Sequence, residues 1–313
     1  MADHVPVLVE AVVAILQPRP GGCYLDATVG LGGHAEAILR ASEPTGMLVG
    51  IDRDREALAL AQRRLEIFGE RVTLLHGRYE SLAEQVGAGS AFDGILFDLG
   101  ASSLQLDTAD RGFSFGREGP LDMRMDRTEG TTAEGIVARR SEAELADLIF
   151  RFGEERWSRR IARAIVEARQ QAPIRSTTAL ANVVSAAIPR RHWPRHIHPA
   201  TRTFQALRIV VNDELGGLNR ALGEAVDLLR PGGRALVMSF HSLEDRVVKQ
   251  RWRSAAAAAS VRILTKRPTR PSEAEILANP RARSARLRAV ERLPVHRAPA
   301  APALGQEPVA EAH

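Results

Sequence analysis

The 313-residue chain predicts an α/β fold in which a doubly wound parallel sheet is interrupted by a helical insertion. Two observations carry this prediction. Within residues 1–104, short continuous apolar runs alternate with amphipathic segments, and continuous apolar runs are typical of strands buried on both faces of a parallel sheet. The alternation then stops and resumes with the apolar run 234–240, which indicates one domain split by another.

The elements of the first part follow from their hydrophobic periodicity. Leu58, Ala61, Leu65 and Phe68 recur at helical spacing, whereas GMLVGI over 46–51 is a continuous apolar run. The expected strands are 23–29, 46–51, 72–76 and 92–97. The expected helices are 34–41, 55–68 and 81–86. This strand–helix order predicts the parallel, doubly wound sheet.

The middle of the chain breaks this order. Residues 104–135 are rich in Gly, Asp, Arg and Met and are expected to be irregular. The helical segments expected after them are 142–152, 156–170, 177–188 and 203–229, the last interrupted at Gly216-Gly217. We therefore assign residues 1–104 and 201–297 to a discontinuous sheet domain and 105–200 to an inserted helical domain. Residues 298–313 are rich in Ala and Pro and are expected to form a disordered tail.

Composition excludes several classes of protein. Hydrophobic residues make up 44% and charged residues 26%, which is typical of globular proteins rather than disordered chains, collagens or coiled coils. No stretch approaches the ~20 apolar residues of a membrane span, and the N-terminus lacks a signal-peptide pattern. Cys23 is the single cysteine, which excludes a disulfide framework and a cysteine-based zinc site. We expect a cytoplasmic enzyme or binding protein with no membrane association and no metal.

The net charge of +5 is unevenly distributed along the chain. Residues 1–105 carry a net charge of −6, and residues 201–313 carry +8. A basic half indicates a polyanionic partner such as nucleic acid. High-GC coding would explain why 41 of the 43 basic residues are arginine, but it would not explain their segregation.

A glycine-rich turn follows the first expected strand and opens the first helix, with the sequence DATVGLGGH from Asp26 to His34. Glycines allow a ligand to approach the backbone, and the helix N-terminus offers free N–H groups. Asp52 ends the second expected strand, where dinucleotide folds place an acid against ribose hydroxyls. Asp26 beside the turn suits a cationic ligand better than pyrophosphate. The pattern favours S-adenosylmethionine over a nicotinamide dinucleotide, which stays as the alternative.

Two further motifs are expected at the same edge of the sheet. Asp98 ends the fourth strand, near the switch point where open α/β sheets bind ligands, and could accept hydrogen bonds from a substrate amine or a cofactor ammonium. An N-cap role is the structural alternative. His241 follows the strand 234–240 and is expected on the same rim, although a single histidine is as often packed as catalytic.

At this point the chain closely resembles a known family. The matching segments include Asp26 to His34, Asp98 to Asp107, 111–115, 119–126, 198–205, Ser239 to Arg246 and 279–284. They resemble the MraW/RsmH family, the bacterial 16S ribosomal RNA cytosine-N4 methyltransferases. The resemblance implies a class I, Rossmann-like, S-adenosylmethionine-dependent methyltransferase sheet with an inserted helical substrate-recognition domain. It places the cofactor contacts on Gly32, Gly33, His34, Asp52, Tyr79, Asp98 and Gln105. Many members carry Phe where this chain has Tyr79, and both offer an aromatic face.

The resemblance also implies the reaction and the partner. The expected reaction moves a methyl group from S-adenosylmethionine to N4 of a cytidine in 16S ribosomal RNA, within the small ribosomal subunit. Asp98, or carbonyl groups of 99–103, would accept hydrogen bonds from the amine, and His241 or water would take its proton. The target base must be splayed out, so Phe113, Phe115 or Trp193 could stack on it. Arg202, Arg281 and Arg283 are candidate phosphate contacts, together with Arg190, Arg191, Arg195 and the rest of the group 281–288.

Three other functions fit parts of the sequence. An NAD-dependent oxidoreductase would use the same fold, but it predicts a different glycine spacing and little basic surface. An RNA-binding assembly factor without activity would not need Asp26, Asp52 and Asp98 together. A DNA or protein methyltransferase is excluded by the resemblance alone. The protein is expected to be a monomer or a homodimer.

Overall fold

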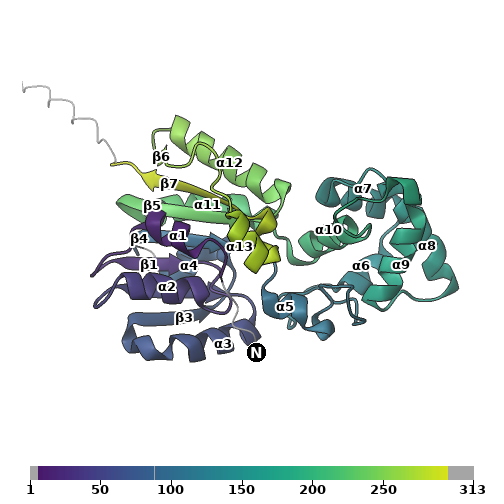
Figure 1. Ribbon diagram of the computed structural model, residues 1–313, viewed down its shortest axis with the longest axis horizontal. Coiled ribbons are helices and arrows are strands. Elements are labelled where there is room, and N and C mark those ends of the chain that lie inside the picture. The colour runs from purple at the N-terminus through teal and green to yellow at the C-terminus, as the bar shows by residue number, and fades with distance from the viewer. Residues whose placement is uncertain (1–5, 88, 295–313) are drawn as a thin grey trace, which may run out of the picture.

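The computed structural model describes residues 6–87 and 89–294. It has two lobes, which Figure 1 shows side by side: a sheet lobe, formed by residues 6–107 and 216–294, and a helical lobe, formed by residues 133–212. The short helix α5 (Ser103–Asp107) lies between them. The expected tail, 298–313, lies outside the described residues.

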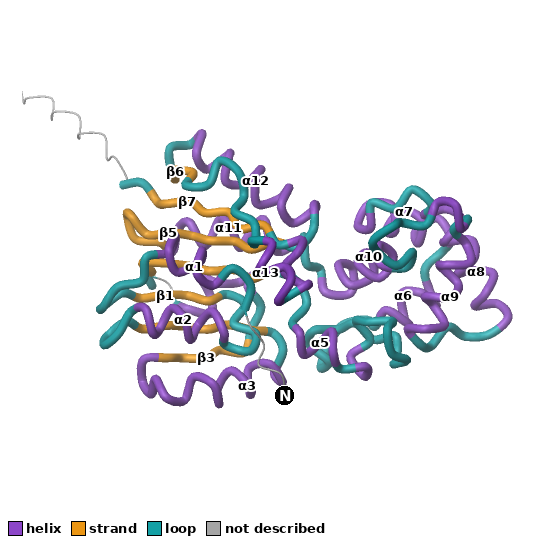
Figure 2. The backbone as a smooth tube through the Cα atoms, in the orientation of Figure 1, coloured by secondary structure: helices purple, strands orange, loops and turns teal. Residues whose placement is uncertain are grey.

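The sheet lobe is built on a sheet with the strand order β3-β2-β1-β4-β5-β7-β6. Neighbouring strands among β1 to β5 are parallel, and β7 is antiparallel to both β5 and β6. Figure 2 shows the strands stacked across this lobe. Their bounds are β1 (Cys23–Asp26), β2 (Met47–Asp52), β3 (Val72–His76), β4 (Phe92–Asp98), β5 (Leu229–Ser239), β6 (Val261–Ile263) and β7 (Arg286–Arg292).

Helices cover both faces of the sheet, as the continuous apolar strands require. On one face, the core joins Val12, Ile38 and Leu65 to Leu236 of β5. On the other, Leu82, Leu222 and Trp252 pack around Phe97 of β4. The helices of the first face are α1 (Val9–Leu16), α2 (Gly33–Ala41) and α3 (Arg55–Leu65). Those of the second are α4 (Leu82–Val86), α11 (Gly216–Leu228) and α12 (Ser242–Ala257). Each fully buried Leu, Ile or Phe side chain contributes about 1.5–3 kcal/mol.

The helical lobe has a core of its own, to which Leu145, Ile161, Leu180 and Phe204 belong. Its helices are α6 (Ala133–Arg139), α7 (Glu142–Gly153), α8 (Ser158–Gln171), α9 (Thr177–Ala187) and α10 (Thr201–Asn212). Helix α7 begins at a capping box in which Ser141 and Glu144 satisfy each other's backbone N–H groups. Because α10 packs against α7 in this core, the chain returns to the sheet lobe after Asn212 rather than at residue 201.

Most local expectations agree with the structure. The expected strand 72–76 is β3, and the helix break expected at Gly216-Gly217 lies just before them, at residues 213–215, so that the two glycines begin α11. The short helix α13 (Glu273–Ala278) and strands β6 and β7 were not predicted. Strand β5 begins at Leu229, ahead of the Pro231-Gly232 turn, and its register against β4 shifts between Phe92 and Gly94. Within the described residues, no helix is long and apolar enough to cross a membrane.

Candidate active site

A cleft lies at the carboxyl ends of β1, β2 and β4, with a cavity volume of about 320 Å³. This is the edge of an open α/β sheet where ligands bind, because the loops diverge there between the strands. The glycine-rich turn, Asp52 and Asp98 line the cleft from the sheet lobe. Arg208 of α10 and Glu214, just before α11, line it from the junction of the two lobes.

The glycine turn between β1 and α2 can be formed only with small residues. Gly30 and Gly32 have φ of +51° and +81°, in the left-handed region that glycine tolerates. A Cβ atom on Gly33 would lie 2.3 Å from the Pro6 ring. The Gly30 N–H donates to Asp52 Oδ2 at 2.7 Å. The glycines therefore allow a tight turn whose backbone is fixed to the acid at the end of β2.

Asp52 lies at the end of β2 and accepts two backbone hydrogen bonds. The second comes from the Asp54 N–H to Oδ1, at 2.9 Å. These bonds favour the ionised carboxyl, but burial outweighs them and raises the pKa of Asp52 to about 6. A hydroxyl or cationic donor in the cleft would complete the shell of this carboxylate.

Asp98, at the end of β4, has one carboxylate oxygen that accepts no hydrogen bond from any described residue. Its backbone N–H donates to Thr28 Oγ1 at 2.6 Å, and its Oδ2 lies 3.4 Å from His34 Nδ1. Its Oδ1 is buried and has no hydrogen-bond partner among the described residues. Burial raises the pKa of Asp98 to about 7, and the Glu244 carboxylate adds to the effect. An orphaned acceptor with such a pKa can accept a hydrogen bond or a proton near neutral pH.

His34 is buried beneath Asp98. Its Nε2 lies 2.8 Å from the Val7 carbonyl, which only accepts, so Nε2 carries the proton. Burial lowers the pKa of His34, and the neutral ring then presents Nδ1 as an acceptor toward Asp98. Asp26 is also buried, and burial raises its pKa to about 7. The three strand-end acids Asp26, Asp52 and Asp98 thus share a site that favours a bound cation or a bound proton.

The other cofactor residues implied by the resemblance also lie at the cleft. Gly32 forms the end of the turn, and Gly33, Tyr79 and Gln105 are lining residues. The Tyr79 hydroxyl donates to the Glu214 carbonyl at 2.9 Å, and its ring meets Phe97 edge to face. Gln105 uses its amide internally: Nε2 donates to Asp54, and Oε1 accepts from the Ser102 N–H. Gln105 is therefore placed to shape the cleft wall.

His241 does not reach the cleft. It is the N-cap of α12, where its Nδ1 accepts from the Glu244 N–H at 3.4 Å and its Nε2 lies 3.1 Å from Glu244 Oε1. Its neighbour Phe240 lines the cleft instead. The capping box holds the ring at the start of α12, yet a ring nitrogen of His241 lies within 4.8 Å of a carboxylate oxygen of Glu214, which lines the cleft, so the catalytic role expected of His241 stays a prediction.

The three aromatic residues expected to stack on the target base lie away from the cleft. Phe113 is buried, and Phe115 packs against His198 and Phe204 in the helical lobe, with ring centroids 4.6 and 4.7 Å away. Trp193 is 37% exposed on the helical lobe and donates its Nε1–H to the Ile188 carbonyl. Phe113 is thus a packing residue, Phe115 is packed but partly exposed, and Trp193 is the most exposed of the three.

The predicted phosphate contacts divide into free and engaged arginines. Arg281 lines the cleft but pairs with Asp107, and Arg202 donates to the Glu154 carbonyl at 3.3 Å. Arg283 is exposed. Arg286 and Arg288 lie on β7 and pair with Asp245, which removes them from the candidates. We define the basic band as Arg190, Arg191 and Arg195, which are exposed and form no ion pair within the described residues.

Two interactions at the cleft could not be predicted from the sequence: the ion pair between Arg208 and Glu214, and the contact between Val7 and His34. Arg208 Nε and Nη2 donate to the two carboxylate oxygens of Glu214, both at 2.8 Å. Val7, which holds His34, precedes every expected element. Arg208 and Glu214 lie more than a hundred residues after the strands that they face, in a segment whose pattern indicated only a helix and a break. No local signal in the sequence could have joined them to the cleft.

The fold and the cleft together define a class I, Rossmann-like methyltransferase. Its marks are the strand order with β7 inserted antiparallel between β5 and β6, the glycine turn after β1, and the acids at the ends of β2 and β4. This confirms the expected fold class.

The chain belongs to the MraW methylase family, whose family model matches residues 1–293. It is 51% identical over 309 residues to "Ribosomal RNA small subunit methyltransferase H" of Pelobacter propionicus, covering 93% of this chain and 99% of that one. It is 50% identical to the protein of the same name from Geobacter sulfurreducens, with the same coverage. Among solved structures, a SAM-dependent O-methyltransferase from Thermotoga maritima aligns with 11% identity and a TM-score of 0.43, covering 94% of this chain and 68% of that one.

Proposed function

We propose that this protein transfers a methyl group from S-adenosylmethionine to the exocyclic N4 of a specific cytidine in 16S ribosomal RNA, within the small ribosomal subunit in the cytoplasm. The observation that carries the proposal is Asp98, which lines the cleft beside the glycine turn with a carboxyl whose pKa is raised to about 7 and whose side chain is 27% exposed. Relatives of about half identity and nearly full length are named small-subunit ribosomal RNA methyltransferases, which supports the RNA substrate.

The residues of the cleft fit S-adenosylmethionine. The backbone of Gly30, Gly32 and Gly33 would accept its methionine part, and the turn needs these glycines because Gly30 and Gly32 have positive φ and a Cβ on Gly33 would lie 2.3 Å from Pro6. Asp52 would bind the ribose hydroxyls, Tyr79 and Gln105 would border the adenine, and His34 would lie against Asp98 in the wall of the cleft. When bound, this cofactor supplies an electrophilic methyl group on a sulfonium. The raised pKa values of the acids support a cationic ligand, because ionising all three without a counter-charge is costly.

Asp98 would activate the acceptor. The cytosine amine is a poor nucleophile because its lone pair is delocalised into the ring. The ionised carboxyl would accept an amine N–H and hold N4 in line with the methyl group, and positioning of this kind supplies a large part of such rate enhancements. As nitrogen loses electron density, a carboxylate with a pKa near 7 can take the proton.

The helical lobe would hold the RNA. The basic band supplies three cationic side chains without acidic partners, and the Trp193 face lies among them. Arg202, Arg281 and Arg283 would add contacts toward the cleft after exchanging protein partners for phosphate. Arginine guanidinium groups bind phosphate oxygens in pairs, which suits an irregular RNA fold better than single-point contacts.

The test uses purified protein and small ribosomal subunits from cells that lack it. Radiolabelled S-adenosylmethionine should label the RNA, and nucleoside analysis should find the label in N4-methylcytidine. Calorimetry should show binding of S-adenosylmethionine and none of NADH. A protein that binds the cofactor but labels no nucleoside would be an assembly factor, and label in another nucleoside would refute the N4 assignment.

A further inference from the structure

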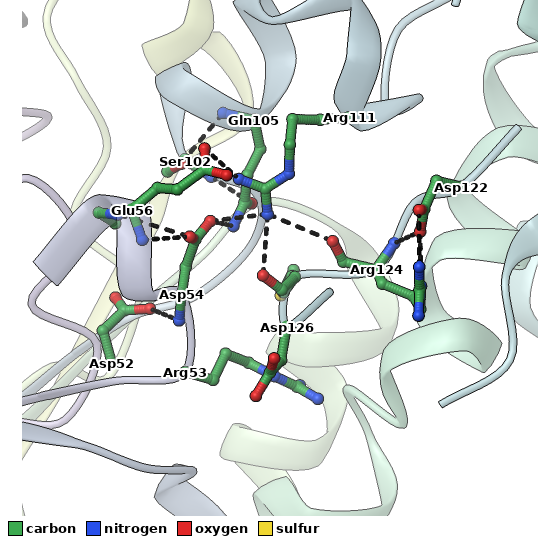
Figure 3. Close-up of polar contacts among 12 residues, drawn as sticks. Asp52, Arg53, Asp54, Glu56, Ser102, Gln105, Arg111, Asp122, Arg124 and Asp126 are labelled. Atoms are coloured by element: carbon green, nitrogen blue, oxygen red, sulfur yellow. Dashed lines mark hydrogen bonds and ion pairs between the residues drawn. The ribbon is translucent and has the colours of Figure 1, made fainter. Parts of the chain in front are cut away.

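Arg111 is the largest fully buried side chain among the described residues, although it carries a positive charge. It is 1% exposed and follows α5, on the segment that leads from the sheet lobe into the insertion. It does not line the cleft. Figure 3 shows its guanidinium group directed at Asp54 and Glu56, whereas Arg124 turns away toward Asp122. A charge so deeply buried needs a compensating network, and that network has two sides.

The first side is the cofactor wall. Arg111 Nη2 lies 2.8 Å from Asp54 Oδ2, which also accepts from Gln105 Nε2 at 2.8 Å. Asp54 Oδ1 caps α3 by accepting from the Glu56 N–H at 3.0 Å, and the Asp54 N–H donates to Asp52. Asp54 thus connects the start of α3 and helix α5 through its carboxylate, and the acid at the end of β2 through its backbone N–H.

The second side is the entry to the helical lobe. Arg111 Nη2 donates to the Met125 carbonyl at 2.8 Å, and the Arg111 carbonyl accepts from the Met123 N–H at 3.0 Å. The Met125 N–H donates to Asn212 Oδ1, and Asn212 Nδ2 donates to the Met123 carbonyl, both at 2.8 Å. Asn212 is the last residue of α10. The network therefore runs without a break from Asp52 at the cleft to the end of the helical lobe.

A buried ion pair is a weak source of stability, because desolvation offsets its Coulomb attraction. What the pair contributes is a fixed geometry, because a planar guanidinium in a site of low dielectric has few alternative arrangements. The position of the Arg111 guanidinium group therefore sets the position of Met125 relative to Asp54. Met125 and Gln105 both line the cleft, on opposite sides of this group.

We propose that Arg111 is a positioning residue for methyl transfer, because it fixes the helical lobe relative to the Asp52 and Asp98 edge of the cleft. The inference rests on the proposed function: the helical lobe holds the RNA, and the sheet lobe holds the methyl donor. Alignment of N4 with the methyl group then depends on the angle between the lobes. A displacement of about 1 Å at the reacting atoms lowers such rates about 100-fold.

The first test compares Arg111→Met, Arg111→Lys and the matched control Arg124→Met. Arg124 lies in the same segment and also pairs with an acid, Asp122, but its side chain does not reach Asp54. We expect Arg111→Met to lower kcat about 100-fold while the Kd of S-adenosylmethionine changes less than about 3-fold. Arg111→Lys should recover part of the rate, and Arg124→Met should stay within about 3-fold of the original protein. A parallel fall in kcat and cofactor affinity, or an unchanged kcat, would overturn the proposal.

Arg111→Met leaves the buried Asp54 carboxylate unpaired, so the doubly substituted Arg111→Met/Asp54→Asn protein serves as the folded counterpart. Its kcat loss should equal that of Arg111→Met alone, because the two residues act through one contact. An additive loss would contradict the shared role.

The second test reads the angle between the lobes without any RNA. Spin labels at Ile67→Cys in the sheet lobe and Arg163→Cys in the helical lobe, both exposed sites, are placed in a Cys23→Ser background. The distance distribution should be narrow with Arg111 and at least twofold wider with Arg111→Met, and Arg124→Met should leave it narrow. An unchanged width would overturn the inference even if methylation is confirmed. A widened distribution would support it even if the RNA substrate proves to be another one.

Discussion

The two lobes hold their charges in opposite ways. In the sheet lobe, Asp26, Asp52 and Asp98 are gathered at strand ends, and burial raises their pKa values to about 6 or 7. In the helical lobe, the basic band lies in water and has no acidic partners among the described residues. Burying a charge away from water costs free energy and therefore requires a specific partner. Exposed charges act additively, and salt screens them. This difference suits the sheet lobe to a single small ligand and the helical lobe to a long polyanion.

The largest effect is expected at Asp98. Replacing it by alanine removes the orphaned acceptor Oδ1 and the group with a pKa near 7, so methyl transfer at saturating cofactor should fall about 10²–10⁴-fold. A radiolabel assay on small subunits measures the rate. His241→Ala is the comparison, because that side chain faces α12, and it should retain most activity. Near-normal transfer by Asp98→Ala would remove Asp98 from the chemistry.

The second-largest effect is expected when the basic band is removed. Substituting Arg190, Arg191 and Arg195 together by alanine should weaken RNA binding roughly 10-fold at 0.1 M salt and reduce the slope of log K against log salt by about 2–3. Fluorescence anisotropy between 50 and 200 mM salt measures both quantities. The control replaces three exposed arginines of the sheet lobe, Arg40, Arg55 and Arg63, and should leave the slope unchanged. Equal effects from both sets would mean that the lobes do not differ in this role.

The affinity for S-adenosylmethionine should rise with pH. Asp98 and Asp52 have pKa values of about 7 and about 6; the ionised Asp98 would attract the cofactor's positive charge without a hydrogen bond to it, and the ionised Asp52 would accept from the ribose hydroxyls. The Kd should therefore fall more than about tenfold between pH 5.5 and 7.5. Calorimetry in two buffers of different ionisation enthalpy should detect the released protons. In Asp98→Asn the dependence should flatten, and an equally steep profile there would assign it to another group.

The smallest effect is on the stability of the free protein. The folded pKa of Asp26 is about 7, above its ordinary 3.8, so the folded state keeps a proton that the unfolded state releases. The stability due to this group is therefore lost as pH rises from about 4 to about 7. Asp26→Asn, which does not titrate, should gain ~2–4 °C in Tm relative to the original protein between pH 5.5 and 8. A constant difference in Tm across this range would mean that Asp26 is ionised throughout.

The sequence predicts the sheet lobe better than the rest of the fold. Strands buried on both faces leave a continuous apolar signature, which is why β2 and β3 were placed within a residue of their bounds. Strand β7 was missed because Arg286, Arg288 and Arg292 interrupt its apolar residues, and they pair with Asp245 or main-chain carbonyls. A strand at the antiparallel side of the sheet can carry such charges, so they were interpreted as RNA contacts.

The site residues divide in a similar way, into those whose position depends on the strands alone and those whose position depends on how the two lobes dock. Asp52 and Asp98 could be predicted, because the carboxyl ends of parallel strands meet at one edge. The Arg208–Glu214 pair and the Arg111 network could not, because they depend on how a lobe with its own core docks on that edge. Phe115 was assigned to the RNA because aromatic type alone does not distinguish a stacking face from a packed one.

The central claim is that the Asp98 cleft methylates N4 of one cytidine in the small-subunit RNA. Its most direct measurement is mass spectrometry of nucleosides from small subunits of cells that lack this protein, complemented with either the original chain or Asp98→Ala. We expect N4-methylated cytidine to disappear at one site in these cells, to return with the original chain and to stay absent with Asp98→Ala. Persistence of the modified nucleoside without the protein, or its full return with Asp98→Ala, would contradict it.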